Sequence, residues 1–177
     1  MIVRSFLLLI PLLFSYCQSQ HVEQNTIRFE QNFEDEMYSN PRIFKVDKFV
    51  DGDTFWVLNH NNQRVKIRLI GIDAPETKNV FNKKKHPFGA ESKRYVDSIL
   101  TINPFLKLDF DVDSLDQYGR TLAYVYLNNG VFLNEHLVRT GNATIMTVAP
   151  NVKYEDLFYK AQIYAREKNL GIWKHDL

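Results

Sequence analysis

Two arginines and three carboxylates stand at strand ends and turns in this chain, a combination suited to chemistry on a phosphate group. Arg68 lies in the stretch VKIRLIGIDAPET at 65–77, and Asp73 and Glu76 follow it. A guanidinium group offers a planar pair of donors to phosphate oxygens and keeps its charge at any working pH. Carboxylate oxygens are preferred ligands of hard cations such as calcium and magnesium. These residue types therefore point to metal-assisted chemistry at phosphorus.

Two further stretches carry the same residue types. Asp53 lies in the acidic turn VDGDT at 50–54, and Arg120 ends the segment DQYGR at 116–120. Each side chain also has an ordinary structural explanation, because aspartates form turns and caps and arginines form salt bridges on barrel surfaces. Short motifs are hypotheses, so the function depends on whether the fold brings these residues together.

The strand that contains Arg68 is indicated by alternation. Val65, Ile67 and Leu69 are apolar, and the residues between them, Lys66 and Arg68, are basic. This period of two predicts a half-buried β-strand. Such a strand would hold the arginine in a fixed direction, which a loop would not do.

The remaining elements predict a small β-barrel closed by helices. An Asp-Gly pair at 51–52 between two apolar runs predicts a hairpin, and a turn is expected at 73–76. Short strands with a helix after the third strand, and helices at the end, favour this architecture. The other expected strands are 44–50, 54–58, 105–110 and 121–127, and the expected helices are 89–100, 133–140 and 153–168. In the last helix the expected apolar face is Tyr154, Leu157, Phe158, Ala161 and Ala165.

Histidine and cysteine do not form a pattern typical of a zinc site. The single cysteine and the five histidines are scattered along the chain. Three carboxylates brought close together would repel one another unless a cation lay between them. A hard divalent cation is the natural candidate, since oxygen ligands favour calcium or magnesium.

The first 17 residues are expected to form an export signal. Arg4 gives a positive start, and the apolar run at 6–14 is short for a membrane span. Cys17 is the only cysteine and follows this run, so it cannot form an intramolecular disulfide. It is either lost with a cleaved signal or carries a lipid, as in bacterial lipoproteins. Tyr16 departs from the small residue usual before a lipidated cysteine.

Residues 18–42 are expected to form a polar N-terminal arm, with a short helix near 30–38 as the alternative. The formal net charge of the whole chain is +1, which excludes a general cationic coat for nucleic acid. This total combines 2 basic and 5 acidic residues in 18–42 with 19 basic and 16 acidic residues in 43–177. The region 43–177 is expected to be a single folded domain.

At this point the sequence resembles the staphylococcal nuclease-like domain family. The resemblance rests on DGDT at 51–54, RLIGIDAPE at 68–76, and DQYGR followed by TLAYVY at 116–126. Weaker support comes from LNEHLVRTGNA at 133–143 and AREKNLGIW at 165–173. The blocks occur in order between about residues 44 and 173. The resemblance implies an α+β fold, a five-stranded OB-fold barrel with three helices.

The resemblance also implies roles for individual residues. Arg68 and Arg120 would clamp the scissile phosphate, and Glu76 would be the general base that orients or deprotonates water. Calcium would be held by Asp53, Asp73 and the backbone carbonyl of Ala74, with Glu76 bound through water. Alanine at 74 departs from the family's threonine but keeps the backbone oxygen. The expected substrate-binding residues are Lys84, Asp116, Tyr118 and Tyr124.

The nucleotide pocket of the family uses two tyrosines that are missing here. Alignment on Pro150 places these positions at Met146 and Val148. Alignment on Gly141 shifts them by one residue, and the segment TIMTVAPN at 144–151 contains no tyrosine in either case. Catalysis is therefore better supported by the sequence than base preference is. Lys83, Lys84 and Lys85 are either a solvated loop or a track for phosphates.

The leading hypothesis is an exported, calcium-dependent, sugar-nonspecific nuclease. It would cut DNA and RNA by loss of the 5′ oxygen, leaving 3′-phosphate ends, and it is expected to be a monomer, secreted or attached to the cell envelope. The alternative is a non-catalytic module of the same fold that binds nucleic acid or protein. A third hypothesis is an envelope lipoprotein whose barrel binds a partner. Arg68, Glu76 and Arg120 favour the enzyme, because such binding modules typically lack this set.

Overall fold

The computed structural model describes residues 28, 31–33, 35–37, 39–79 and 85–174. Residues 40–177 form one compact unit, distinct from residues 1–39. The described residues between 28 and 39 are helical or lie at a helix end, which agrees with the alternative of a short helix in the arm. The expected export signal and Cys17 lie outside the described residues. Among the helices that are described, none has the length and apolar character needed to cross a bilayer.

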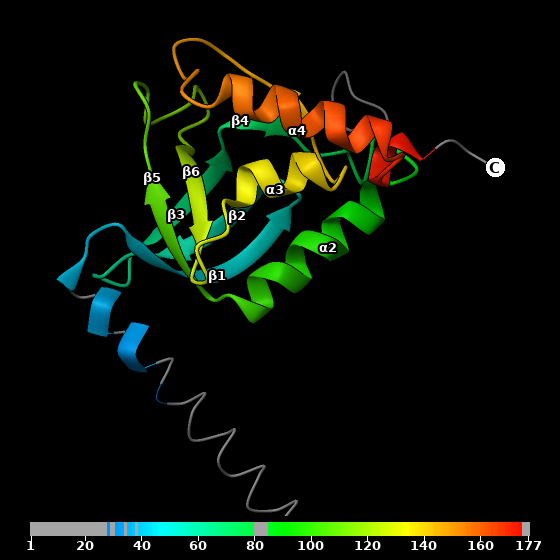
Figure 1. Ribbon diagram of the computed structural model, residues 1–177. Helices are drawn as coiled ribbons and strands as arrows, with labels where there is room; N and C mark the ends of the chain where they lie inside the picture. Colours follow the sequence, from blue (N-terminus) through cyan, green and yellow to red (C-terminus); the bar gives the residue numbers. More distant parts are fainter. Residues whose placement is uncertain (1–27, 29–30, 34, 38, 80–84, 175–177) are drawn as a thin grey trace, which may run out of the picture. The chain divides into compact units, whose positions relative to one another are not determined.

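Five strands close into a barrel in the order β1-β2-β3-β6-β5 (Figure 1). The pairs are antiparallel except for β3 and β6, which run parallel. Alternation along these strands places one set of side chains inside the barrel. The expected α+β class and five-stranded OB-fold barrel are therefore confirmed. The strands are β1 (Ile43–Asp51), β2 (Thr54–Leu58), β3 (Arg64–Leu69), β5 (Phe105–Asp109) and β6 (Thr121–Leu127).

The hairpin between β1 and β2 brings an aspartate beside β3. The hairpin that the Asp-Gly pair predicts is present, but its tip lies one residue later than expected. Asp51 pairs with Thr54, so the tip is formed by Gly52 and Asp53. Thr54 is in turn the cross-strand partner of Arg68. The hairpin tip and the arginine therefore lie next to one another, although 15 positions in the sequence separate residue 53 from residue 68.

A second, two-stranded sheet was not expected from the sequence. It pairs β4 (Gly71–Asp73) with β7 (Thr144–Met146), and Asp73 lies opposite Thr144. Asp73 thus ends a short strand, whereas the sequence had indicated a turn. Gly71 has a φ of 77°, and a Cβ there would lie 2.5 Å from the ring of Phe158. A glycine is needed at this bend because a side chain would collide with the last long helix.

Within the described residues of the unit 40–177, three α-helices and a short 3₁₀ helix accompany the barrel. Helix α3 packs against α4, β6 and β4, α4 also contacts β7, and α2 contacts β1. Within α4, Phe158, Ala161 and Ala165 are buried, whereas Leu157 is 40% exposed, contrary to its expected place on the apolar face. The buried residues recur at spacings of three and four along α4, so they form one narrow stripe on the helix. The helices are α2 (Gly89–Ile102), α3 (Leu133–Arg139), α4 (Glu155–Glu167) and η1 (Gly171–Trp173).

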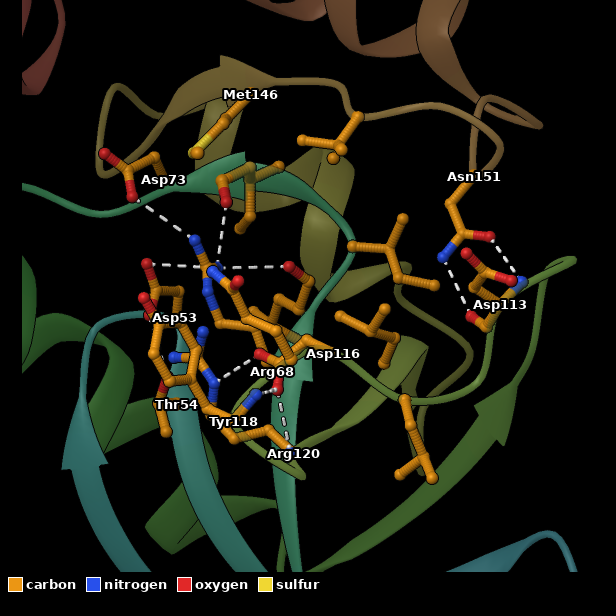
Figure 2. Close-up of a pocket in the computed structure, with 18 of the residues that line it drawn as sticks. Asp53, Thr54, Arg68, Asp73, Asp113, Asp116, Tyr118, Arg120, Met146 and Asn151 are labelled. Atoms are coloured by element: carbon orange, nitrogen blue, oxygen red, sulfur yellow. Dashed lines mark hydrogen bonds and ion pairs between the residues drawn. The ribbon is translucent and has the colours of Figure 1, made fainter.

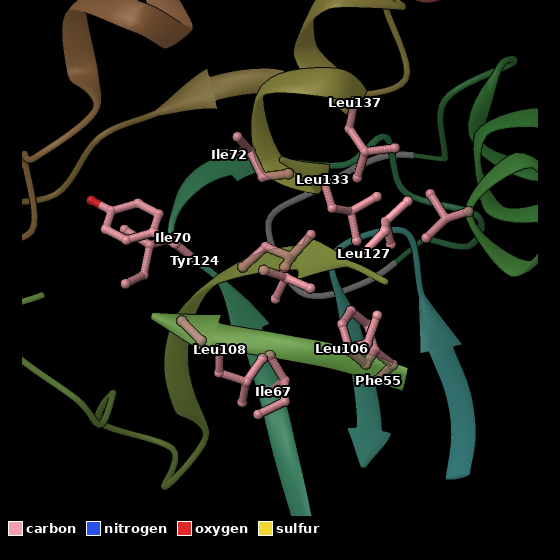
Figure 3. Packing of buried hydrophobic residues seen from close by; sticks show 14 of the residues in the cluster. Phe55, Ile67, Ile70, Ile72, Leu106, Leu108, Tyr124, Leu127, Leu133 and Leu137 are labelled. Atoms are coloured by element: carbon pink, nitrogen blue, oxygen red, sulfur yellow. The ribbon is translucent and has the colours of Figure 1, made fainter. Parts of the chain in front are cut away.

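The core fills the barrel and the space beneath α3 (Figure 3). Asn134 of α3 is fully buried there, and its side chain ties three elements together. Its Oδ1 accepts the backbone N–H of Val125 at 2.9 Å, and its Nδ2 donates to the carbonyl of Ile70 at 2.9 Å. The amide thereby satisfies two buried backbone groups, and it fixes the bend that follows the strand of Arg68.

Candidate active site

An open cavity of about 630 Å³ lies where the hairpin tip, the end of β3 and two loops meet (Figure 2). One loop runs from 110 to 120 between β5 and β6, and the other runs from 147 to 154 between β7 and α4. Arg68, Arg120, Asp53, Asp73 and Glu76 all line this cavity. The fold therefore brings to one pocket five of the six residues that were predicted for catalysis and metal binding. Ala74, the sixth, lines a smaller cavity that shares Asp73 and Glu76 with it.

Arg68 is the centre of the pocket's polar network. Its Nη1 lies 3.1 Å from Asp53 Oδ2, and its Nη2 lies 3.2 Å from Asp73 Oδ1. Nη1 also donates to the carbonyl oxygens of Leu69 at 3.1 Å and Ile72 at 2.9 Å. With only 12% of its side chain exposed, the guanidinium is fixed in one orientation between the two carboxylates.

Asp53 is held by donors from both sides of the pocket. Its Oδ1 accepts the hydroxyl of Thr54 at 3.0 Å, and its Oδ2 accepts the backbone N–H of Ala74 at 2.9 Å. Together with Arg68, this makes three donors to a carboxylate that can accept about four hydrogen bonds. The carboxylate is therefore fixed in position, and one of its lone pairs is left to bind a further donor or a cation.

Arg120 is positioned by Asp116, four residues earlier. Its Nε donates to Asp116 Oδ2 at 2.6 Å, and the guanidinium carbon lies 5.4 Å from the ring centre of Tyr118. Burial alone would raise the pKa of Asp116. Hydrogen bonds from the backbone and side chain of Arg120 and from the backbone of Tyr118 outweigh burial and lower that pKa. Asp116 therefore stays ionised and orients the arginine. It also lines the cavity, so its expected contact with substrate stays a prediction.

Glu76 lines the same cavity, and its backbone is held in place by the start of α2. Its carbonyl oxygen accepts the N–H of His86 at 2.9 Å. Gly89, the first residue of α2, passes so close that a Cβ there would lie 2.3 Å from this oxygen. Glu76 also lines a second, smaller cavity together with Asp73, Ala74 and His86. In the described part of the chain, no three acidic, histidine or cysteine side chains are grouped closely enough to hold a metal by themselves.

Tyr124 does not line the cavity, which corrects its expected role in substrate binding. It is 1% exposed, and its hydroxyl donates to Asp111 Oδ2 at 2.8 Å. Burial, followed by the bond to Asp111, raises the pKa of Tyr124 well above its usual value. Tyr124 belongs to the aromatic cluster between the barrel and α4, where it packs edge-on against Tyr154. Its contribution is to hold the base of the 110–120 loop.

The two loops that form the pocket are joined by Asn151, a residue that the sequence did not single out. Its Oδ1 accepts the N–H of Asp113 and its Nδ2 donates to the carbonyl of Asp113, both at 2.8 Å. A backbone N–H of the same loop, that of Lys153, donates to Asp111 at 3.2 Å. These bonds connect the loop of Arg120 to the loop after β7.

With this geometry established, similarity to known proteins becomes informative. Residues 66–175 match the family model described as staphylococcal nuclease homologue. The thermonuclease of Staphylococcus hyicus is 35% identical over 137 residues, covering 77% of this chain and 79% of that protein. The thermonuclease of Staphylococcus intermedius is 37% identical over 131 residues, covering 74% and 76%. Endonuclease YncB of Bacillus subtilis strain 168 is 35% identical over 130 residues, covering 72% and 60%.

The chain belongs to the staphylococcal nuclease family. The resemblance carried by the DGDT, RLIGIDAPE and DQYGR segments is thus confirmed. Those three segments supply Asp53, Arg68, Glu76 and Arg120 to one cavity in this staphylococcal nuclease homologue.

The rim of the pocket in this staphylococcal nuclease homologue is aliphatic. Met146 is 46% exposed and Val148 is 61% exposed, and both line the cavity together with Leu115. Tyr118, which is 74% exposed, is the aromatic side chain among the residues that line the cavity. A base bound here would meet one tyrosine ring and several aliphatic groups. Lys84, the remaining expected substrate contact, lies outside the described residues.

The lining of the pocket is strongly acidic. Six carboxylates, those of Asp51, Asp53, Asp73, Glu76, Asp113 and Asp116, face two guanidinium groups, which leaves an excess of four negative charges. An anionic phosphodiester would be repelled by this excess unless a cation were bound beside it. The chemistry of the donor set fits a hard divalent cation, because the carboxylates of Asp53 and Asp73, which flank Arg68, both offer oxygen ligands.

Proposed function

We propose that this protein is an exported, calcium-dependent nuclease that acts as a monomer and hydrolyses phosphodiester bonds in both DNA and RNA. The observation that carries the proposal is that Arg68, Arg120 and Glu76 line one cavity. Two fixed guanidinium groups beside a carboxylate suit the hydrolysis of a phosphodiester, since they supply transition-state donors and a base. The relatives named thermonuclease and endonuclease support the same reaction class.

In this proposal the arginines bind the two non-bridging oxygens of the scissile phosphate. Negative charge grows on these oxygens as water attacks phosphorus, so donors already aimed at them stabilise the transition state more than the ground state. Arg68 is oriented by Asp53 and Asp73, and Arg120 is oriented by Asp116. Neither guanidinium has to reorganise while the charge develops.

Glu76 accepts the proton of the attacking water. A new bond forms between the water oxygen and phosphorus, and the bond between phosphorus and the 5′ oxygen breaks. The water proton passes to the carboxylate of Glu76, and the leaving 5′ oxygen takes a proton from solvent. The products are a 3′-phosphate end and a 5′-hydroxyl end.

Asp53, Asp73 and the carbonyl of Ala74 would hold calcium, with Glu76 joined through water. When bound, calcium supplies positive charge beside the phosphate in a pocket whose lining is otherwise acidic. The fit rests on the oxygen ligands that Asp53 and Asp73 offer on either side of Arg68 and on the excess of carboxylates. Few protein ligands and an irregular, hydrated shell suit calcium better than magnesium, which requires a near-octahedral site.

A cleavage assay with and without chelator tests the proposal. We expect the purified protein to degrade single-stranded DNA and RNA when calcium is present and to lose this activity in excess chelator. Calcium should restore the activity and magnesium should restore little of it. Labelled ends should be 3′-phosphates. Arg120→Ala, purified in parallel, controls for a contaminating nuclease.

Three outcomes would count against this function. Full activity in excess chelator would remove the metal from the mechanism. Products with 5′-phosphate ends would show that the 5′ oxygen is not the leaving group. Binding of DNA with no cleavage under any metal condition would favour the alternative, a non-catalytic binding module.

Export is supported by the sequence of residues 1–17, where a positive start precedes a short apolar run. We expect the mature chain to begin at or just after Cys17. Intact mass spectrometry of protein from the envelope or the medium of the native host measures this directly. A diacylglycerol mass on Cys17 would select lipid attachment, and a cytoplasmic chain that keeps Met1 would exclude export.

A further inference from the structure

A basic surface lies beside the pocket on the outer face of the first three strands. Ile67 of β3 is fully buried inside the barrel. Side chains alternate along a strand, so Arg64, Lys66 and Arg68 project from the outer face of β3. Residues two apart on a strand are about 6.6 Å apart, which is comparable with the spacing of successive phosphates in an extended single strand. These three basic side chains therefore form a row that begins at the pocket with Arg68 and continues away from it to Arg64.

Strand pairing places a tryptophan and another lysine beside this row. Trp56 of β2 is the cross-strand partner of Lys66 on one side and of Lys48 on the other. The Lys66 Nζ lies 5.7 Å from the centre of the Trp56 ring, and the Arg64 guanidinium carbon lies 5.3 Å from it. We call Lys48, Trp56, Arg64 and Lys66 the β1–β3 basic face.

One carboxylate shares this face. Arg64 Nε donates to Asp47 Oδ2 at 2.7 Å, and Nη2 contacts the same oxygen. This pair holds the guanidinium over the Trp56 ring, where the two flat groups form a platform. Three cations against one carboxylate leave the face with a net positive charge, opposite in sign to the excess in the pocket.

The β1–β3 basic face is continuous with the catalytic arginines. Lys66 lies two residues before Arg68 on the same face of β3. On the other side, Arg120 immediately precedes Thr121, which pairs with Ile67 where β3 and β6 run parallel. Lys66 is therefore the next cation beyond both arginines. A polyanion that leaves the acidic pocket along β3 meets this face first.

We infer that the β1–β3 basic face binds the part of a single-stranded nucleic acid that extends beyond the cleaved phosphate. Lys66 and Lys48 contact its phosphates, and a base stacks on the platform of Trp56 and Arg64. The outer surface of strands 2 and 3 is where OB-fold barrels commonly bind oligonucleotides. The inference rests on the proposed nuclease function and adds the route of the substrate strand. It also accounts for affinity, which the acidic pocket alone does not provide.

Binding measured in chelator, where no cleavage occurs, tests this route independently of catalysis. A labelled 20-nucleotide single strand is titrated at several salt concentrations into the wild type, Lys48→Gln/Lys66→Gln and Lys160→Gln. Lys160 is exposed on α4, so it controls for a simple change of net charge. Each phosphate contact contributes about 0.7 to the slope of log affinity against log salt for single strands. We expect the double variant to lower the slope by about 1.4, and the Lys160 variant to leave it unchanged.

Tryptophan emission gives a second readout. The chain has two tryptophans, so Trp56→Phe leaves Trp173 as the remaining emitter. We expect the single strand to quench wild-type emission and to leave the emission of Trp56→Phe unchanged. Urea unfolding of each variant checks that the fold is intact.

Kinetics separates this inference from the proposed function. With calcium, the double variant should show a higher KM for the 20-nucleotide strand, an unchanged kcat, and unchanged turnover of a dinucleotide. The inference is overturned if the double variant keeps the wild-type salt slope, or if the strand does not quench Trp56. If the β1–β3 basic face instead binds an acidic protein, the single strand would show neither the lowered slope nor the quenching. A wild-type protein that cleaves nothing would overturn the proposed function, while the titrations in chelator would still decide the binding route.

Discussion

Replacing Arg68 with alanine is expected to lower kcat on single-stranded DNA by about 100-fold or more, the effect typical of removing one preorganised transition-state donor. The same change should destabilise the fold by about 3 kcal/mol, because it breaks a buried ion-pair network. The guanidinium lies between Asp53 and Asp73 and also donates to two backbone carbonyls. Without it, the two carboxylates repel one another and the carbonyls lose their donor.

Arg120→Ala is the matched variant. The guanidinium of Arg120 has the same proposed chemical role as that of Arg68, but it makes fewer contacts that stabilise the fold. We expect a similar loss of kcat and a change in unfolding free energy within about 1 kcal/mol. Its partner Asp116 keeps hydrogen bonds from the backbone N–H groups of residues 118 and 120, which the substitution leaves in place. Steady-state kinetics with calcium and urea unfolding measure the two quantities on the same preparations.

The lysine variants show whether charge alone is sufficient. Arg68→Lys and Arg120→Lys should each recover little kcat, since lysine restores the charge without the planar pair of donors. Arg68→Lys also keeps a cation between Asp53 and Asp73, so it should recover part of the stability. Near-normal kcat in either alanine variant would remove that arginine from the chemistry. Equal stability losses at both sites would contradict the role of Arg68 as the bridge within the pocket.

The strands β2 and β3 were predictable because one face of each is buried and the other is more exposed. Alternation in the segment 64–69 identified β3, and the Asp-Gly pair identified the hairpin before β2. Both signals are local, since one face of a strand must be apolar and a tight turn restricts its residues. The β4–β7 sheet has three residues in each strand, too few for a period of two to be recognised. Its pairing depends on residues about 70 positions apart.

Tyr124 shows where local pattern failed in the site. In β6, Ala123, Tyr124 and Val125 are all buried, so both faces of the strand are covered. The barrel covers one face, and helices and aromatic side chains such as Phe158 cover the other. The sequence around a strand carries no information about which helix will cover it. A tyrosine near a functional motif was therefore assigned to substrate when it belongs to the core.

The residues of the candidate site were predictable as a set, whereas their connections were not. Arg68, Glu76 and Arg120 came from short motifs that lie within the range matching the family model. That Arg68 bridges Asp53 and Asp73 depends on the hairpin tip and the bend at Gly71, which only the fold brings together. The pairing of Asp116 with Arg120 is local in the sequence, because the two residues are four positions apart in one turn.

Glu76→Gln is expected to lower kcat by about 100-fold or more, within the range of 10²–10⁴ typical of a positioned general base. Glutamine has nearly the same shape, and its amide oxygen still accepts a hydrogen bond from water, but it cannot take the proton. Binding of a nucleoside 3′,5′-bisphosphate, measured by calorimetry with calcium, should be nearly unchanged, since the two arginines that hold phosphate are untouched. A fall in kcat with intact binding is the signature of a group that acts in the chemical step.

Asp113→Asn provides the control for charge, because it also removes one carboxylate from the lining of the same cavity. Its backbone, which pairs with Asn151, is not altered by the substitution. We expect Asp113→Asn to keep kcat within a few-fold of the wild type. Equal losses in both variants would mean that the pocket depends on its total negative charge and not on a base at position 76. A loss below about tenfold in Glu76→Gln alone would reduce the role of Glu76 to orienting water, because a neutral acceptor would then do almost as well as a base.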